Sequence, residues 1–211
     1  MGVETPVKVA VIDHGTGNLT SLVRALEKLG ANPVRIAPDA SQEDFDLAFL
    51  PGVGAFPAAM TALEDQGWIG WIGQWVASGK PILGICLGMQ LLFDRSFELE
   101  ETEGLGLIGG DVTQISAEGE RVPHIGWSEI RWTQSNPLQL GLEESAAMYH
   151  VHSFVVHPTE SSSVLATAVH GEEFATAVWN GRNVFGAQFH PEKSSEDGLR
   201  FLANFLALGK G

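Results

Sequence analysis

The chain has 211 residues and a mass of 22.6 kDa, enough for one domain with a sizeable core and too little for two catalytic domains of ordinary size. Its 26 acidic and 12 basic side chains give a formal net charge of −14, which would repel a nucleic-acid backbone or an anionic membrane. A hydrophobic fraction of 44% excludes a disordered chain. We expect residues 1–211 to form a single domain that binds neither nucleic acid nor membrane.

The first half of the sequence alternates β-branched apolar runs with segments of helical periodicity. Strands are predicted at residues 7–12, 33–36, 46–50 and 81–85. Helices are predicted at residues 18–29, 55–63, 68–77 and 87–93. Strands that alternate with helices form parallel sheets. Three tryptophans spaced i, i+3 and i+7 in one helix, Trp68, Trp71 and Trp75, indicate a face buried in the core.

The second half consists mostly of short β-rich segments separated by turns. Strands are predicted at residues 111–115, 128–132, 148–156, 164–169, 174–179 and 183–189. An amphipathic helix over residues 196–206 ends the pattern. The sequence therefore predicts an α/β fold, a doubly wound and mostly parallel sheet with added antiparallel strands.

Cys86 is the single cysteine, which excludes an internal disulfide and suits a reducing, cytoplasmic location. It lies in the segment Gly84-Ile85-Cys86-Leu87-Gly88, where a predicted strand runs into a predicted helix. This G-x-nucleophile-x-G pattern is typical of a nucleophile elbow, a strained turn that projects a reactive side chain. The N–H groups at the start of the helix favour an anionic sulfur, and the first of them could hold an oxyanion.

A base for this thiol is present in His190-Pro191-Glu192, which follows the last predicted strand. A nucleophilic cysteine needs a base, and the base needs a partner that holds its tautomer. Pro191 keeps the chain extended, so His190 and Glu192 can project to the same side. The alternative for Cys86, an inert core residue, has no use for this pair. We predict a Cys86–His190–Glu192 triad.

The other histidines fit hydrogen-bonded structural or surface positions better than catalytic ones. This group is His14, His124, His150, His157 and His170. His150 and His152 share one face of a predicted strand and could hold a metal with His190, but the spacing suggests no further ligand, and we predict no metal site. The loop 13–18 lacks the G-x-G-x-x-G spacing of a dinucleotide site, so no such cofactor is expected.

The loop Pro51-Gly52-Val53-Gly54 follows a predicted parallel strand at the same sheet edge as the elbow. Glycines on both sides of Val53 allow its peptide to turn its N–H in either direction. The loop could therefore form an oxyanion hole. An ordinary βα turn accounts for the same residues equally well.

The segments 84–93 and Gln188-Phe189-His190-Pro191-Glu192-Lys193-Ser194 together resemble the class I (triad) glutamine amidotransferases. The resemblance extends over residues 7–206 and implies a flavodoxin-like fold. Segments 51–56, 123–127 and 151–153 narrow it to the glutaminase subunits of imidazole glycerol phosphate synthases, in histidine biosynthesis. It implies L-glutamine as the substrate, no cofactor, and a heterodimer with a (βα)8-barrel cyclase subunit that receives the ammonia.

The resemblance also assigns roles by position. It implies Cys86 as the nucleophile, His190 as base and proton donor, and Glu192 as the residue that orients His190. It places the oxyanion hole at the N–H groups of Val53 and Leu87. Glutamine would be bound by Gly52, Gly54, Gln90, Glu98 and Ser153, with Glu98 pairing with the α-ammonium group. The cyclase would be contacted through Pro123, His124, Gly126 and Trp127.

Some positions depart from the family pattern. His14, His150 and Phe154 stand where other aromatic residues are usual, and Gly109-Gly110 stands where Pro-Gly is common. Three other functions fit parts of the sequence. They are a triad amidotransferase subunit serving anthranilate, aminodeoxychorismate, guanylate or pyridoxal phosphate synthesis, a stand-alone cysteine hydrolase, and an inactive regulatory paralogue.

Overall fold

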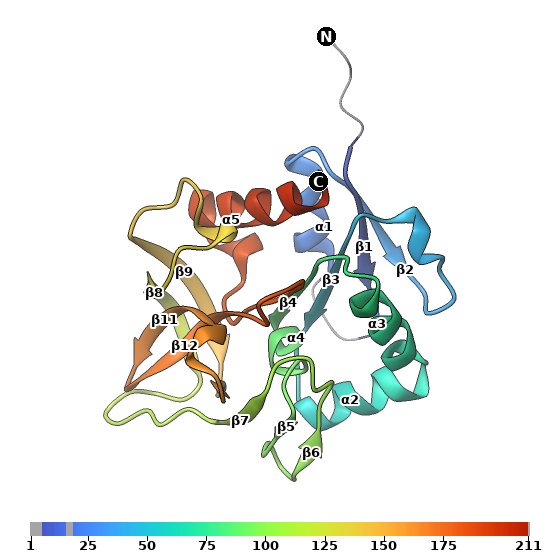
Figure 1. Cartoon of the computed structure of the whole chain (residues 1–211). Coiled ribbons are helices and arrows are strands. Elements are labelled where there is room, and N and C mark those ends of the chain that lie inside the picture. The colour runs from blue at the N-terminus through green and yellow to red at the C-terminus, as the bar shows by residue number, and fades with distance from the viewer. Residues whose placement is uncertain (1–5, 16–18, 211) are drawn as a thin grey trace.

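The computed structural model describes residues 6–15 and 19–210 (Figure 1). Within these residues, thirteen strands join in one sheet. The parallel strands are β1 (Lys8–Ile12), β2 (Asn32–Ile36), β3 (Leu47–Gly52), β4 (Ile82–Cys86) and β13 (Val184–Ala187). Their spatial order is β2-β1-β3-β4-β13, the order of flavodoxin-like doubly wound sheets. The predicted fold class is confirmed.

Helices cover both faces of the parallel strands (Figure 1). The larger helices are α1 (Leu19–Lys28), α2 (Phe56–Asp65), α3 (Trp68–Ala77) and α5 (Ser195–Ala207). α1 and α5 pack on one face, and α2 and α3 pack on the other. Each face of the sheet therefore has its own hydrophobic core, the first under α1 and α5 and the second under α2 and α3. Side chains alternate along β1, so Val9 and Val11 lie in the first core, and Ala10 and Ile12 lie in the second. The tryptophan stripe of α3 is buried in the second core, as predicted.

The antiparallel strands extend the sheet beyond β13. They are β7 (Gly110–Gln114), β8 (His124–Trp132), β9 (Ser145–His152), β10 (Phe154–Pro158), β11 (Val164–His170) and β12 (Glu172–Trp179). β12 pairs antiparallel with β13 and with β11, which leads to β8 and β9. β10 and β7 continue the main sheet. Among the described residues, no helix has the length and apolar character that a membrane crossing requires.

The predicted helix over residues 87–93 is shorter than expected, because α4 covers only Leu87–Gln90. The carbonyl groups of the next three residues accept hydrogen bonds from a distant segment instead of continuing the helix. Leu105 N–H donates to Leu91 O, Gly106 N–H to Phe93 O, and Leu107 and Ile108 N–H both donate to Leu92 O. Tertiary pairing thus overrides the apolar periodicity of the sequence.

The predicted strand over residues 148–156 is two strands, β9 and β10, which are separated at Ser153. β9 pairs with β8, whereas β10 pairs with β7 and β12, so the chain changes partners at this point. The Ser153 carbonyl accepts a hydrogen bond from Ile115 N–H, which fixes the break. As a result, residues 151–154 lie beside the elbow and line the same cavity as Cys86.

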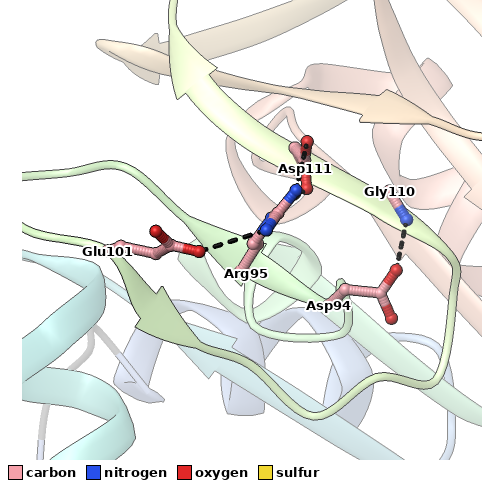
Figure 2. A network of polar contacts seen from close by, with 5 residues as sticks. All are labelled: Asp94, Arg95, Glu101, Gly110 and Asp111. Carbon is pink, nitrogen blue, oxygen red and sulfur yellow. Dashed lines mark hydrogen bonds and ion pairs between the residues drawn. The ribbon is translucent and has the colours of Figure 1, made fainter.

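Two further short strands, β5 (Arg95–Ser96) and β6 (Thr102–Glu103), are absent from the prediction, and they form a hairpin over residues 95–103. Figure 2 shows how charges hold this hairpin to β7. The Arg95 guanidinium contacts Asp111 at 2.8 Å and Glu101 at 3.1 Å, and the Gly110 N–H donates to the Asp94 carboxylate at 2.8 Å. The hairpin connection carries Glu98 toward the elbow.

Candidate active site

The nucleophile elbow has the strained geometry that the sequence predicts. Cys86 has φ 56° and ψ −112°, a backbone conformation that residues other than glycine rarely adopt. A Cβ at Gly84 would lie 2.5 Å from the Gly88 carbonyl oxygen, and a Cβ at Gly88 would overlap the Leu50 carbonyl oxygen. Both glycines are therefore sterically required, and they let α4 start directly against β3 and β4.

The triad residues converge at the carboxyl ends of β4 and β13. The Nδ1 atom of His190 lies 2.9 Å from Glu192 Oε1, and His190 lines the same cavity as Cys86. Burial alone would lower the pKa of His190, but hydrogen bonds and charge interactions with Cys86 and Glu192 outweigh it and raise that pKa to about 9. An imidazolium beside the sulfur is therefore favoured at neutral pH, as thiolate catalysis requires.

The backbone of His190 is fixed to β9. His190 N–H donates to the Tyr149 carbonyl at 2.9 Å, and the Ser194 hydroxyl donates to the His190 carbonyl at 2.7 Å. Ser194 Oγ also accepts the Tyr149 N–H at 2.9 Å. β9, through the Tyr149 backbone, thus holds His190 in position.

The loop after β3 lies beside the elbow, as an oxyanion hole requires. Gly52 pairs with Cys86 in the parallel register of β3 and β4, so Val53 immediately follows the residue opposite the nucleophile. Gly54 has φ 102°, which favours glycine, and Val53 is 42% exposed. His14 Nε2 lies 2.9 Å from the Pro51 carbonyl oxygen and anchors the end of the strand. Residues 16–18 of the glycine-rich loop 13–18 lie outside the described residues.

A cavity of about 290 Å³ opens in front of the Cys86 thiol, enough for one amino acid. Most of the predicted site residues line it, namely Val53, Gly54, Cys86, Leu87, Gln90, Glu98, Ser153 and His190. Gly52 lies behind it, where a Cβ would come within 3.1 Å of Gly88 N and the Leu87 side chain. Five further residues line the cavity, namely Pro123, Val151, His152, Phe154 and Lys193.

Two polar side chains of the cavity are already oriented. Gln90 Nε2 donates to the Phe154 carbonyl at 3.0 Å and to Gln188 Oε1 at 3.1 Å, which leaves the Gln90 carbonyl oxygen available to a ligand. Glu98 Oε2 accepts the Phe56 N–H at 2.8 Å, at the start of α2. Both residues present acceptors suited to an ammonium or amide group.

Two groups that contact the sulfur were not predicted from the sequence. The Gln188 side-chain amide lies 3.8 Å from the thiol sulfur, and the thiol donates to the Val151 carbonyl at 3.6 Å. Gln188 lies in the predicted strand 183–189, two residues before His190, so the period of a strand could have placed both on the same side, although β13 itself ends at Ala187. The contact with Val151 depends on the break between β9 and β10, which the sequence did not reveal.

In the segment 123–127, Pro123 directly precedes β8, and residues 124–127 form the start of that strand. Ile125 is 61% exposed and Trp127 is 53% exposed, while Pro123 is exposed and lines the cavity. His124 points inward and is only 4% exposed, so its side chain does not belong to this surface. Alternation along the strand explains why neighbouring residues differ in this way.

Four histidines form a cluster behind this strand, namely His124, His150, His152 and His170. His152 Nδ1 donates to the Phe154 carbonyl at 3.0 Å, so its Nε2 accepts from His124 Nδ1, also at 3.0 Å. Burial lowers the pKa of His124 to about 4 and that of His152 to about 3, and it lowers that of His150 well below its usual range. His124, His150 and His152 are therefore neutral at physiological pH, and His124 and His152 are hydrogen-bonded to each other.

His150 is oriented by protein groups. Its Nε2 lies 2.7 Å from the Thr176 hydroxyl, and its Nδ1 lies 3.1 Å from the Met148 carbonyl oxygen. Within residues 6–15 and 19–210, no group of three or more His, Cys, Asp or Glu side chains is arranged to hold a metal ion. His157 and His170 are likewise hydrogen-bonded, to the Thr113 hydroxyl and the Arg121 carbonyl.

Comparison with known proteins agrees with this geometry. Residues 10–208 match the family model described as glutamine amidotransferase class-I. The chain is 43% identical to the imidazole glycerol phosphate synthase subunit HisH of Moorella thermoacetica over 93% of both chains. It is 42% identical to the subunit of the same name from Aquifex aeolicus, over 94% of this chain and 96% of that one.

Solved structures share the fold at lower identity. PurLQS from Thermotoga maritima superposes with a TM-score of 0.75 at 22% identity, covering 96% of this chain and 99% of that chain. A glutamine amidotransferase from Thermotoga maritima gives a TM-score of 0.69 at 15% identity, covering 99% of this chain and 100% of that chain. Given its elbow, its triad and a family match over nearly its whole length, the chain belongs to the class I glutamine amidotransferases.

Proposed function

We propose that this chain is the glutaminase subunit of an imidazole glycerol phosphate synthase, which hydrolyses L-glutamine to glutamate and ammonia. One observation carries the proposal: Cys86 and His190 line one cavity of amino-acid size, and Glu192 Oε1 lies 2.9 Å from the Nδ1 atom of His190. The relatives from Moorella thermoacetica and Aquifex aeolicus both carry the name imidazole glycerol phosphate synthase subunit HisH.

In the first step, the Cys86 thiolate attacks the side-chain amide carbon of glutamine. The new C–S bond converts the carbonyl into a tetrahedral oxyanion, which the N–H groups of Leu87 and Val53 stabilise. Each such donor contributes about 10²–10³ in rate. The His190 imidazolium then protonates the amide nitrogen, the C–N bond breaks, and ammonia leaves behind a thioester.

In the second step, neutral His190 removes a proton from a water molecule, which attacks the thioester carbon. The second tetrahedral intermediate collapses, the C–S bond breaks, and glutamate and the thiolate are released. His190 keeps the proton taken from water, the product acid releases its own proton to solvent, and the thiolate–imidazolium pair is restored. Glu192 stays ionised throughout and stabilises the imidazolium.

The substrate is oriented by the polar lining of the cavity. Glu98 supplies a carboxylate for the α-ammonium group, and the Gln90 carbonyl oxygen supplies a second acceptor. Backbone groups of Gly54 and Ser153 would bind the rest of the glutamine, whereas Gly52 lies behind the cavity and does not line it. A hydrolase without specificity for glutamine would not need the paired acceptors of Gln90 and Glu98.

The ammonia requires a partner, because free ammonia in water at neutral pH is mostly protonated and no longer nucleophilic. We assign that role to a (βα)8-barrel cyclase subunit, which would use the ammonia to form imidazole glycerol phosphate and aminoimidazole carboxamide ribotide. The contact surface would include Pro123, Gly126 and Trp127, as the resemblance implies, together with the exposed Ile125. The His124 side chain is buried and would lie behind this surface. Large exposed apolar side chains in a row are typical of interface cores.

We further propose that the subunit is nearly silent alone. Val53 stands between two glycines, and the Val53 N–H would turn toward the oxyanion only when the partner carries its nucleotide substrate. Glutamine turnover should be measured for the free chain and for the complex with and without the nucleotide. Acceleration in the last condition supports gating, and equal rates in all three would reject it.

The assignment itself is tested by co-purifying the chain with the cyclase of the same organism and supplying glutamine. Glutamine-dependent cyclisation is expected, and ammonium salts should replace glutamine in the absence of this chain. Failure to associate, with activity instead in a complex that makes anthranilate, aminodeoxychorismate, guanylate or pyridoxal phosphate, would assign the subunit to that pathway.

A further inference from the structure

Gln188 is a polar side chain beside the nucleophile that the mechanism above does not use. It follows the end of β13, is completely buried, and its Nε2 atom lies 3.8 Å from the Cys86 sulfur. A buried amide needs partners for its own donor and acceptor. The partner of the Gln188 side-chain oxygen determines which end of the amide group faces the sulfur.

The orientation of the Gln188 amide is set by Gln90. Gln90 Nε2 has two hydrogens, and it donates one to the Phe154 carbonyl and the other to Gln188 Oε1. Because Phe154 O can only accept, the Gln90 amide group must be turned this way. Gln188 Oε1 is then the acceptor of the pair, and the Gln188 Nε2 group faces the sulfur as a donor.

The sulfur therefore has contacts that suit its two protonation states differently. The Val151 carbonyl, 3.6 Å away, can accept a hydrogen bond only from the protonated thiol. The Gln188 N–H can donate to a thiolate, and a hydrogen bond to an anion is stronger than one to a neutral group. Loss of the thiol proton removes the Val151 bond and strengthens the Gln188 bond.

We propose that Gln188 is a catalytic residue of this site, whose side-chain amide donates a hydrogen bond to the Cys86 thiolate and stabilises the nucleophile. His190 supplies the positive charge, and Gln188 supplies a neutral donor held in a fixed direction. Gln90, which lines the glutamine cavity, holds the Gln188 amide in place, so the substrate-binding and nucleophile-stabilising groups form one hydrogen-bonded chain. The inference deepens the proposed glutaminase activity and rests on it for its biological meaning.

The formation of the thiolate can be measured without glutamine or a partner. Cys86 is the only cysteine, so the rate of alkylation by iodoacetamide as a function of pH reports this one sulfur. Gln188→Leu removes the donor at similar volume, and Gln188→Glu replaces the donor with a carboxylate. We expect the alkylation midpoint to move up by about one pH unit in Gln188→Leu and further in Gln188→Glu.

A matched control lies at the other end of β13. Asn183 is also a buried amide, donating to the Val76 and Lys80 carbonyls, and it has no contact with the sulfur. Asn183→Asp should leave the alkylation midpoint unchanged. An unchanged midpoint in both folded Gln188 variants would overturn the proposal.

A measurement on the wild-type chain covers the case in which these variants do not fold. The side-chain amide resonances of Gln188, followed by NMR, should shift with pH at the midpoint found by alkylation, and Cys86→Ser should abolish the shift. Resonances that stay fixed while the thiol ionises would overturn the proposal. None of these readouts depends on glutamine turnover, so failure of the proposed enzyme activity is distinguished from failure of this inference.

Discussion

The Glu98 carboxylate accepts the backbone N–H of Phe56 at 2.8 Å, so one side chain both caps α2 and lines the cavity in front of Cys86, where we propose that glutamine binds. These two roles use different properties of the residue. Capping needs only an acceptor oxygen, whereas binding an α-ammonium group needs the negative charge. Substitutions that separate oxygen from charge can therefore separate stability from substrate binding.

Glu98→Gln should raise the KM for glutamine by about 10- to 100-fold, consistent with the loss of one charge-assisted contact. Its melting temperature should stay near that of the wild type, because the amide oxygen can still accept the Phe56 N–H. Glu98→Ala should show the same KM defect and lose about 1 kcal/mol of unfolding free energy. Steady-state kinetics and thermal melting check both; a Glu98→Gln variant with unchanged KM would remove Glu98 from the binding site.

Cys86→Ser should abolish glutamine-dependent activity in the complex, a loss of at least about 10³-fold, because the hydroxyl is a poor substitute for a thiolate. The same complex supplied with ammonium salt should retain its cyclisation rate, since the acceptor site is proposed to lie on the partner. A coupled product assay under both conditions checks this. If Cys86→Ser retained glutamine-dependent activity, the nucleophile would have to be elsewhere.

Glu192→Gln tests the charge that supports His190. The interactions with Cys86 and Glu192 raise the pKa of His190 to about 9 against the effect of burial, so the imidazolium persists up to that pH. Activity should therefore fall as the pH rises through about 9. In Glu192→Gln the same decline should move to lower pH, and kcat should drop by about 10²- to 10⁴-fold. A pH profile with an unmoved alkaline limb would show that Glu192 does not act on His190.

The same raised pKa links His190 to stability. A group whose pKa is higher in the folded state than its ordinary value of 6.5 stabilises the fold fully below 6.5, and this contribution disappears as the pH rises through about 9. Unfolding by urea at pH 7 and pH 10 should show the loss in the wild type. His190→Asn should show a smaller difference, and an equal difference would exclude His190 as its source.

The histidine cluster predicts the opposite pH dependence. Burial lowers the pKa of His152 to about 3, so the unfolded chain takes up a proton below pH 6.5 that the folded chain refuses. Stability should fall as the pH drops below 6.5, by roughly 2 kcal/mol at pH 5 for His152 alone. Urea unfolding at pH 7.5 and 5 measures this loss. His150→Phe should reduce the slope, and an unaltered slope would show that His150 does not contribute.

Local sequence rules predicted the parts of the molecule that local forces determine. The parallel strands, the helix pair on each face and the elbow all follow from apolar periodicity and from glycines that have no room for a Cβ. His190 and Glu192 pair as predicted, but the predicted reason is wrong: the chain is not extended after His190, because Pro191–Lys193 form a short 3-10 helix that brings the two side chains together.

The errors arose where distant segments decide the local structure. Leu91 and Phe93 continue the helical pattern, but their carbonyl groups pair with residues 105 and 106 instead of with the next turn. Ser153 interrupts a regular β pattern because its carbonyl accepts the Ile115 N–H. His124 was assigned to the partner surface by resemblance, and only the strand register shows that its ring faces inward.

The most direct test of the account labels the free chain with a diazoketone analogue of glutamine, which alkylates a nucleophile only when it occupies the glutamine cavity. We predict one adduct, located on Cys86 by peptide mass spectrometry, formed more slowly in the presence of glutamine and in His190→Asn. Labelling at another residue, or labelling of Cys86 at a rate that glutamine does not change, would contradict a Cys86-centred glutaminase.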